Sequence, residues 1–204
     1  ELVTEVPKQT EIPRIRLGSI EPWDLPTDFW RLFESPRLMP HLHLPLQSGS
    51  DSVLRRMSRR CKTDEFSQLL QDARSSVPDF NVTTDIIVGF PGETDAEWQE
   101  TFDYVEQTGF GHIHIFPFSP RSGTKAANLP DQIADDVKKA RCAELDALAG
   151  KLKHQTLGSY IGQTMPVLIE GNSSQKNSTW NGYTPNFLRI GIDAPESASL
   201  GNRI

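Results

Sequence analysis

Strand-like and helix-like segments alternate along most of this chain, and this alternation constrains its fold more than any other feature. Apolar patterns predict strands at Ile12–Ser19, Met39–Leu46, Val82–Phe90 and Gly111–Phe118. Apolar residues at helical spacing predict helices at Thr63–Val77, Thr94–Gln107 and Asp131–Gln155. Strands that alternate with helices favour a parallel sheet with crossover helices, so we predict an α/β fold.

The second predicted strand divides its side chains between two faces. Leu42, Leu44 and Leu46 fall on one face, and His41 and His43 fall on the other. His112 and His114 share a face of the fourth predicted strand in the same way. No helical pair and no neighbouring carboxylate in the sequence completes a zinc site, so we favour packed or hydrogen-bonded histidines over metal ligation.

The helix at Thr94–Gln107 carries signals for both of its ends. Thr94 and Glu97 have the spacing of a capping box, in which each side chain bonds the backbone N–H of the other residue. Gly109 follows the last turn and supplies a stop. These signals fix the register of the helix before any tertiary contact is considered.

The composition changes after about Gly158, where helical periodicity stops. Glycine, asparagine, serine and threonine become frequent, and two further strands are predicted at Thr164–Glu170 and Asn186–Ile192. We therefore divide the chain into residues 1–157, which would form barrel units, and residues 158–204, which would form a small all-β domain. The boundary is expected near residues 157–162.

A polar turn follows each of the four predicted parallel strands. These turns are Ser19–Pro22, Gln47–Asp51, Gly89–Thr94 and Ser119–Thr124. In α/β barrels the active site is built on the loops at the carboxyl ends of the strands. Any single polar cluster could simply mark a turn, because glycine, proline and serine are common turn residues. Four such clusters on one rim favour a functional role.

The residue types in these turns fit a polar, partly charged small molecule. Gly92 precedes the capped helix, whose free N–H groups favour an anion. Glu21 could accept hydrogen bonds from ribose hydroxyls or an ammonium group, and Arg59 and Arg121 could pair with a carboxylate or phosphate. Asp85 lies inside its strand, where an inward carboxylate is costly unless it is paired.

Charge and cysteine content exclude several classes of protein. The net charge of −6 argues against a generic nucleic-acid coat but leaves room for a local basic patch. Cys61 and Cys142 are too few and too far apart for an iron–sulfur cluster, a structural zinc or a disulfide framework. A reducing cytoplasm is therefore expected. No apolar run is long enough to span a membrane, so we expect no membrane partner.

Four long motifs occur in order along the chain: RIRLGSIEP, HLHLPLQSGSDSVLRRMSRR, TTDIIVGFPGET and HIFPFSPRSGTKAA. Together they closely resemble the radical S-adenosylmethionine (SAM) methylthiotransferases over most of residues 12 to 160. The tail, through Pro166–Glu170 and Gly182–Phe187, is similar to the TRAM domain that follows the barrel in this family. The resemblance implies a partial (β/α) barrel, with about four of six strand–helix units, followed by a TRAM/OB-like β domain.

The same resemblance implies an activity and a substrate. Family members add a methylthio group at C2 of a modified adenosine beside the tRNA anticodon. The S-I-E-P turn from Ser19 to Pro22 is similar to the branch that acts on N6-threonylcarbamoyladenosine. The alternatives are the isopentenyladenosine tRNA branch, the ribosomal-protein branch, another radical enzyme with a fused β module, and a catalytically dead RNA-binding scaffold.

Residue roles follow from the motif matches. The resemblance implies a SAM pocket that includes Ser19, Glu21, Gln47, Ser48, Arg59, Asp85 and Arg121. It implies tRNA contacts by Lys176, Trp180, Tyr183, Arg189 and Arg203 in the tail. A place in the small β core is the competing interpretation for the aromatic residues.

The chain also departs from the family pattern. Family members use two 4Fe–4S clusters, and this sequence lacks the CxxxCxxC motif that holds one of them. Cys61 stands where the family usually has an aromatic residue, and Cys142 falls on a helix. We therefore expect a fragment that is inactive alone, whose barrel needs the missing N-terminal portion of the same protein as its partner.

Overall fold

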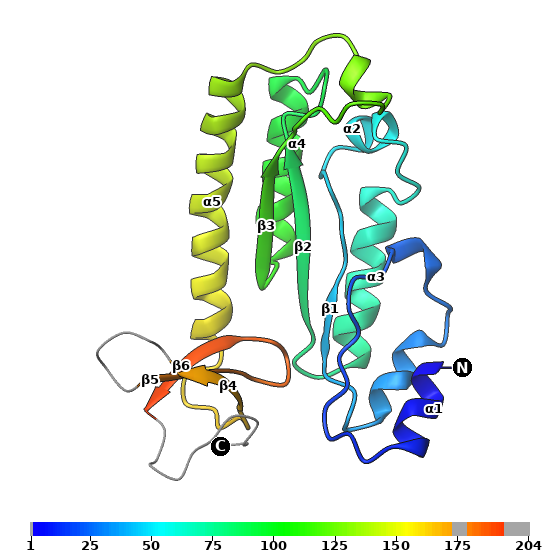
Figure 1. Ribbon diagram of the computed structural model, residues 1–204, viewed down its shortest axis with the longest axis vertical. Helices are drawn as coiled ribbons and strands as arrows, with labels where there is room; N and C mark the ends of the chain where they lie inside the picture. Colours follow the sequence, from blue (N-terminus) through cyan, green and yellow to red (C-terminus); the bar gives the residue numbers. More distant parts are fainter. Residues whose placement is uncertain (1, 173–178, 194–204) are drawn as a thin grey trace.

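The computed structural model describes residues 2–172 and 179–193, and it contains two sheets (Figure 1). The strands of the first sheet are β1 (His41–His43), β2 (Asn81–Val88) and β3 (His112–Pro117), and those of the second are β4 (Leu168–Asn172), β5 (Thr179–Tyr183) and β6 (Arg189–Asp193). The α-helices are α1 (Leu2–Gln9), α2 (Asp51–Arg56), α3 (Thr63–Ser76), α4 (Asp95–Thr108) and α5 (Asp135–Gly158). Short 3-10 helices occupy Pro22–Asp24, Phe29–Glu34 and Ala126–Asn128.

The first sheet is parallel and has the order β1-β2-β3. His43 pairs with Thr83 between β1 and β2, and Asp85 pairs with His114 between β2 and β3. Crossover helices α3 and α4 join these strands, as the alternation in the sequence predicts. The α/β fold with parallel strands is thus confirmed for this part of the chain.

The strand predicted at Ile12–Ser19 is wrong as a regular strand. The segment forms only isolated parallel bridges, from Ile15 to Leu38 and from Ser19 to His43. It runs beside β1 in an extended conformation, at the edge of the parallel sheet (Figure 1). Alternating side chains in one segment do not by themselves secure a continuous ladder, because the ladder requires a partner in register.

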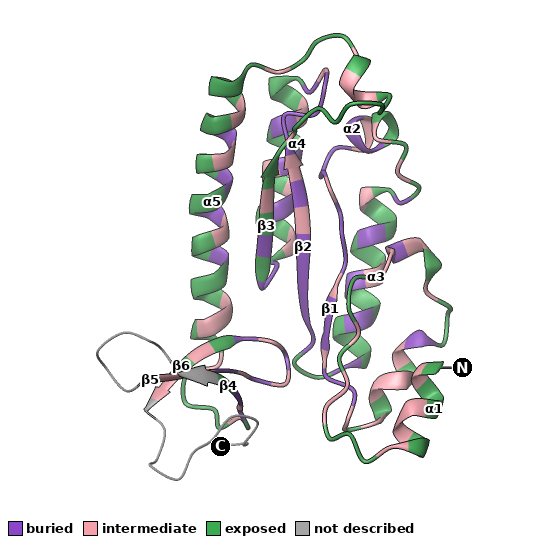
Figure 2. Ribbon diagram, viewed as in Figure 1, coloured by how far each residue is buried: buried purple, intermediate pink, exposed green. Residues whose placement is uncertain are grey.

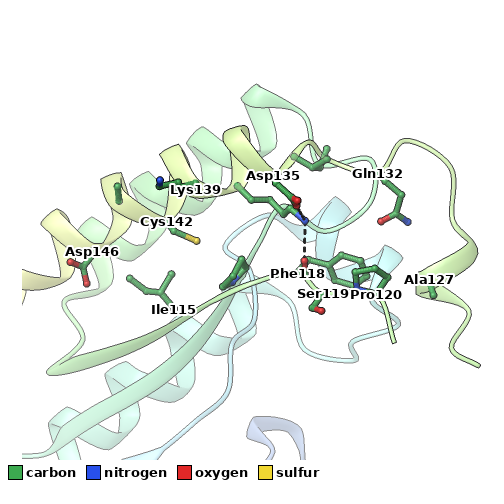
Figure 3. Close-up of a pocket in the computed structure, with 14 residues that line it drawn as sticks. Ile115, Phe118, Ser119, Pro120, Ala127, Gln132, Asp135, Lys139, Cys142 and Asp146 are labelled. Atoms are coloured by element: carbon green, nitrogen blue, oxygen red, sulfur yellow. Dashed lines mark hydrogen bonds and ion pairs between the residues drawn. The ribbon is translucent and has the colours of Figure 1, made fainter. Parts of the chain in front are cut away.

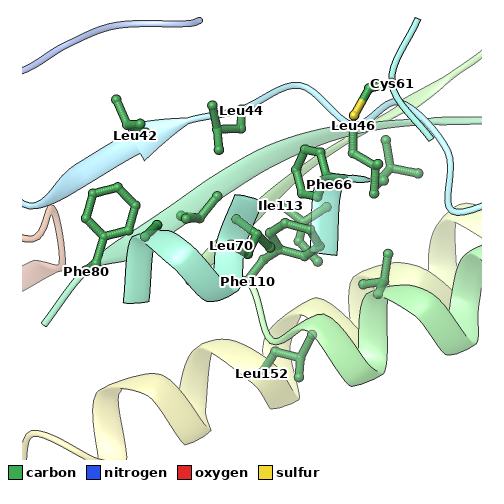
Figure 4. Close-up of a cluster of buried hydrophobic side chains, with 14 of the residues drawn as sticks. Leu42, Leu44, Leu46, Cys61, Phe66, Leu70, Phe80, Phe110, Ile113 and Leu152 are labelled. Atoms are coloured by element: carbon green, nitrogen blue, oxygen red, sulfur yellow. The ribbon is translucent and has the colours of Figure 1, made fainter. Parts of the chain in front are cut away.

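The core lies between the sheet and its helices, as the burial colours show (Figure 2). Leu42 and Leu44 of the β1 segment are fully buried, and they face Phe66 and Leu70 of α3 (Figure 4). Phe110 and Leu152 close the same cluster from the α4–β3 turn and from α5. The leucine face predicted for the second strand is therefore the core face.

The ends of α4 confirm the sequence signals. Glu97 N–H donates to Thr94 Oγ1 at 3.2 Å, and Thr94 N–H donates to Glu97 Oε2 at 2.9 Å. Gly109 terminates the helix in the left-handed conformation, with φ of 66°. The capping box was read correctly because it depends on residues only three apart.

The second sheet is antiparallel with the order β4-β5-β6, and it lies at the amino ends of the parallel strands (Figure 1). Arg14 donates to the carbonyl oxygens of Tyr183 and Pro166, at 3.0 Å in each case. Asn81, at the start of β2, donates from Nδ2 to Asn186 O at 2.8 Å. We call the second sheet and its connecting loops the β module. These bonds dock the β module against the amino ends of the parallel strands.

Candidate functional site

The turns after β1, β2 and β3 meet at the carboxyl edge of the parallel sheet, at the top of Figure 1. Glu21 and Arg59 are brought together at this rim, with Arg59 Nη2 2.7 Å from Glu21 Oε2 and Nη1 3.2 Å from Oε1. Arg59 also donates to Pro45 O at 2.9 Å and lies over the ring of Trp23. Glu21 therefore presents a half-exposed carboxylate that is held in one orientation.

Two other residues predicted for this pocket have different surroundings. Ser48 is fully buried, and its hydroxyl lies 3.0 Å from Thr101 Oγ1 of α4. In this structure its hydroxyl therefore supports the turn from the side of α4. Arg121 is exposed on the loop that follows β3.

Gln47 adopts a strained backbone conformation at the end of the β1 segment. Its φ of 77° lies in the left-handed region, which non-glycine residues seldom occupy. Its backbone nevertheless bonds β2 on both sides, donating to Asp85 O and accepting from Ile87 N. Strain that persists within a hydrogen-bonded framework is a frequent property of functional turns.

The predicted anion site at the start of α4 is occupied by the protein's own carboxylate. Glu97 caps the helix and forms a bidentate pair with Arg56, at 2.8 Å for each nitrogen. Arg56 lowers the pKa of Glu97 to about 2, so this carboxylate is ionised at neutral pH. The free N–H groups on which the anion prediction rested are therefore already satisfied in part.

A second polar cluster lies on the face of the sheet that the helices leave open. His43 Nε2 lies 3.2 Å from Asp85 Oδ2, and His43 Nδ1 lies 3.0 Å from Thr83 Oγ1. One ligand atom from each of His43, Asp85 and His114 lies within 4.8 Å of the other two. The prediction that no carboxylate neighbours these histidines is therefore wrong in three dimensions.

The strand register explains why sequence reasoning missed this cluster. His43, Asp85 and His114 stand on three adjacent strands, and more than 25 residues separate each from the next. Strands in register are about 4.8 Å apart, so side chains on one face become neighbours only after the sheet forms. One sequence signal could have pointed to the cluster. Each of these residues lies inside its predicted strand, on the face that the helices do not cover.

A cavity of about 380 Å³ opens above this cluster. Its lining includes Ser19, Asp85 and His114, with Phe187 from the β module at its base. His41 is also part of the lining, and burial, followed by Arg16 and His43, lowers the pKa of His41 to about 3. His41 is therefore neutral in the folded protein at any pH near 7.

A larger cavity, of about 1030 Å³, lies away from this polar cluster (Figure 3). It separates the end of β3 from α5, and Ile115, Phe118 and Cys142 contribute to its wall. Lys138 of α5 also lines it and donates to Phe118 O at 3.2 Å. Size alone therefore does not identify the site, because the convergent polar groups are elsewhere.

The two thiols do not fit an iron–sulfur cluster. Cys61 is buried, and burial raises its pKa to about 11. Burial also raises the pKa of Cys142, which lies on α5. Cluster ligands are thiolates, and within residues 2–172 and 179–193 no group of three cysteines converges.

The β module holds three of the five predicted tRNA contacts within the described residues. Arg189 is exposed and Trp180 is half-buried. Tyr183 stacks on Phe187, with ring centroids 4.5 Å apart and an interplanar angle of 11°, so one of its faces is already used. Lys176 and Arg203 lie outside the described residues.

Comparison with known proteins gives a family. The sequence pattern of the radical SAM superfamily matches residues 4–105. Coproporphyrinogen III oxidase (HemN) from Escherichia coli, a radical SAM enzyme, superposes with a TM-score of 0.58 at 14% identity. The superposition covers 84% of this chain and 44% of that one, and it shows likeness of fold.

Curated relatives are more similar in sequence. Threonylcarbamoyladenosine tRNA methylthiotransferase MtaB of Thermotoga maritima is 44% identical over 174 residues, or 83% of this chain and 39% of that protein. The tRNA-2-methylthio-N(6)-dimethylallyladenosine synthase of Staphylococcus haemolyticus is 35% identical over 202 residues, or 97% of this chain and 38% of that protein. This chain thus spans about two fifths of the length of these relatives. None of its described helices is long and apolar enough to cross a membrane.

Proposed function

Because the chain belongs to the radical SAM superfamily, we propose that it forms part of a tRNA methylthiotransferase. The proposed enzyme adds a methylthio group at C2 of N6-threonylcarbamoyladenosine beside the anticodon. The observation that carries this proposal is the polar rim on parallel strands, in a chain 34% and 44% identical to two threonylcarbamoyladenosine tRNA methylthiotransferases.

SAM would bind at the rim formed by the turns after the parallel strands. The Glu21 carboxylate, oriented by Arg59, suits the ribose hydroxyls or the ammonium group of that cofactor. Gln47 bridges to Ile86 near the rim, Ser19 bridges to His43 lower on the sheet, and Arg121 is exposed and available to a carboxylate. Asp85 lies deeper, with His43, so we place it below the cofactor. When bound, SAM supplies the radical that gives the superfamily its chemistry.

The described residues do not provide ligands for the clusters that such a reaction uses. Cys61, on the loop before α3, is a buried thiol, and Cys142, on α5, is a half-buried one; burial raises the pKa of both. We therefore assign no chemical step to a cluster in this chain. Ligands for such clusters would have to come from outside the described residues.

The lining of the 380 Å³ cavity supports the threonylcarbamoyl substrate over the dimethylallyl one. Most of its side chains are polar, including Arg16, His43, Thr83 and His114. A dimethylallyl group is a hydrocarbon, whereas a threonylcarbamoyl group carries a carboxylate, a hydroxyl and amide groups. These polar side chains could pair with the carboxylate and amide groups of the threonylcarbamoyl substituent, whereas a dimethylallyl group would leave them unpaired.

We further propose that the β module is TRAM-like and grips tRNA. Arg189 would contact phosphate, and Trp180 offers a ring for stacking. The module is docked at the base of the sheet through Arg14 and Asn81, so it would hold the RNA in a fixed relation to the rim. A rigid attachment of this kind would position the anticodon loop.

The test is nucleoside mass spectrometry of tRNA from a strain that lacks the gene. The 2-methylthio derivative of N6-threonylcarbamoyladenosine should disappear, and the dimethylallyl counterpart should persist. Re-expression of the gene should restore the threonylcarbamoyl derivative, and a gene that carries Glu21→Gln should restore it poorly. Loss of the dimethylallyl derivative would assign the other tRNA branch. Unchanged levels of both would overturn the enzymatic proposal and favour an RNA-binding scaffold.

A further inference from the structure

We propose that His43, Asp85 and His114 bind a divalent transition-metal ion on the open face of the parallel sheet. The three residues offer two imidazole nitrogens and a carboxylate oxygen, all within 4.8 Å of one another. Two histidines and one carboxylate are a ligand set for Zn²⁺ and for non-haem Fe²⁺, and they leave coordination positions open. This inference does not rest on the proposed methyl-thiolation reaction.

The geometry of the strands produces this ligand set. Asp85 and His114 are partners across β2 and β3, and His43 stands on the other side of β2. His43 Nε2 and Asp85 Oδ2 are 3.2 Å apart, close to the ~3.3 Å that separates two ligands of a tetrahedral ion at its usual bond lengths. His114 is exposed, so its side chain can rotate to complete the set.

A supporting hydrogen bond selects the nitrogen that faces the metal. Thr83 Oγ1 lies 3.0 Å from His43 Nδ1, which leaves Nε2 directed at Asp85. Metal-bound histidines usually have such a partner on the second ring nitrogen, because it fixes the tautomer and the ring orientation. Thr83 is itself buried at the centre of the sheet, so it is a rigid support.

The site is accessible to a metal and to a further ligand. The side chains of His43 and Asp85 are 18% and 24% exposed, and all three residues line the 380 Å³ cavity. The open coordination positions would face this cavity and accept an oxygen donor such as a carboxylate. His41 is not a ligand, because its Nε2 is engaged with Thr83 and its Nδ1 is buried.

The test is a Co²⁺ titration of the chelator-treated 204-residue chain, followed by visible absorption, with Zn²⁺ as the competitor. One equivalent of Co²⁺ should bind and give d–d bands without thiolate charge-transfer bands, and Zn²⁺ should displace it. Asp85→Asn and His114→Ala should each weaken binding about 100-fold or more, and Thr83→Val about 10-fold. Binding should weaken in acidic buffer, because protons compete with the metal for its ligands.

Matched controls separate the site from other donors. His112→Ala removes the exposed histidine two residues from His114 on the same strand and should leave Co²⁺ affinity unchanged. The Cys61→Ser, Cys142→Ser double variant should also bind normally. Because the His114 side chain is exposed, the circular dichroism and unfolding midpoint of the His114→Ala variant should match those of the parent chain. Absent stoichiometric binding, unaltered affinity in His114→Ala, or dependence on the cysteines would each overturn the proposal.

Discussion

Arg141 and Glu93 form a buried ion pair that fastens α5 to the turn after β2. Arg141 Nη1 lies 2.7 Å from Glu93 Oε2, and the two side chains are only 7% and 1% exposed. Glu93 also accepts from Gly89 N–H at 2.9 Å, so the pair holds the turn that joins β2 to α4. This turn is one of the four polar turns at the rim.

We predict that Arg141→Met lowers the free energy of unfolding by about 3–5 kcal/mol, because it leaves the Glu93 charge buried and unpaired. Urea unfolding at neutral pH measures the change. Lys151→Met is the control, since Lys151 is 57% exposed in its pair with Glu106 and should cost only ~0–1 kcal/mol. Equal losses of unfolding free energy for the two substitutions would show that the buried pair stabilises the fold no more than the exposed one.

Gly49 and Gly150 should respond oppositely to alanine. A Cβ at Gly49 would lie 2.7 Å from Tyr104 Cβ and 2.8 Å from Thr101 Cα, so Gly49→Ala should cost about 1–3 kcal/mol. Gly150 lies inside α5 with open space around its position, so Gly150→Ala should stabilise by roughly 0.5–1 kcal/mol. Thermal unfolding of both variants distinguishes them, and a stabilising Gly49→Ala would refute the close packing of this turn on α4.

The pH dependence of stability should contain a contribution from His41. The folded protein keeps His41 neutral down to about pH 3, because burial and the nearby Arg16 and His43 lower its pKa. The unfolded chain protonates this residue near pH 6.5, so it binds more protons between these values and stability rises with pH. His41→Gln should reduce this slope by up to ~1.4 kcal/mol per pH unit.

Unfolding in urea at several pH values between 7 and 4 tests the His41 prediction. The other titrating groups are shared, so the difference between parent and variant isolates His41. Parallel pH profiles for the two proteins would contradict the prediction.

Phe187 should control the docking of the β module. Its ring stacks on Tyr183, lies 4.6 Å from the His41 ring and sits 3.6 Å beneath the Arg16 guanidinium carbon. Phe187→Ala removes all three contacts, so amide hydrogen exchange of residues 184–193 should quicken while α3 is unaffected. Phe116→Ala, at a half-exposed ring in the same cavity, should leave that exchange unchanged. If amide protection of residues 184–193 were the same in the Phe187 variant and the parent chain, contacts other than those of Phe187 would hold the β module in place.

If the β module grips tRNA as proposed, Arg189→Ala should weaken tRNA binding and lower the salt slope of the binding constant by about one, because the proposed phosphate contact would be lost. Fluorescence anisotropy across a range of salt concentrations measures both quantities. Lys8→Ala is the control, because Lys8 is exposed on α1 and pairs locally with Glu5. A loss of the same size in the Lys8 variant would indicate non-specific attraction instead of a defined β-module surface.

Local signals were reliable where residues close in sequence decide the structure. Thr94, Glu97 and Gly109 set both ends of α4, and Leu42 and Leu44 identified the core face of their strand. The predicted strand at Ile12–Ser19 became an extended segment with isolated bridges, and α2 was missed. Both depend on partners that are distant in the chain.

The candidate site was predicted less well than the fold. The sequence placed Glu21 and Arg59 on a common rim, and the structure pairs them at 2.7 Å. It also placed Ser48 there, but packing against Thr101 buries that hydroxyl behind the turn. A polar residue in a turn can face either the ligand or the next helix, and the choice depends on the crossover geometry.

The sequence by itself determined the parallel α/β arrangement, the polar turns and the family, because each follows from patterns within short segments. Only the tertiary structure brought His43, Asp85 and His114 to within 4.8 Å of one another, and only it seated Phe187 against His41. These relationships depend on strand register and on docking between parts more than 20 residues apart. No periodicity in a single segment encodes them, since they arise when the sheet aligns its strands.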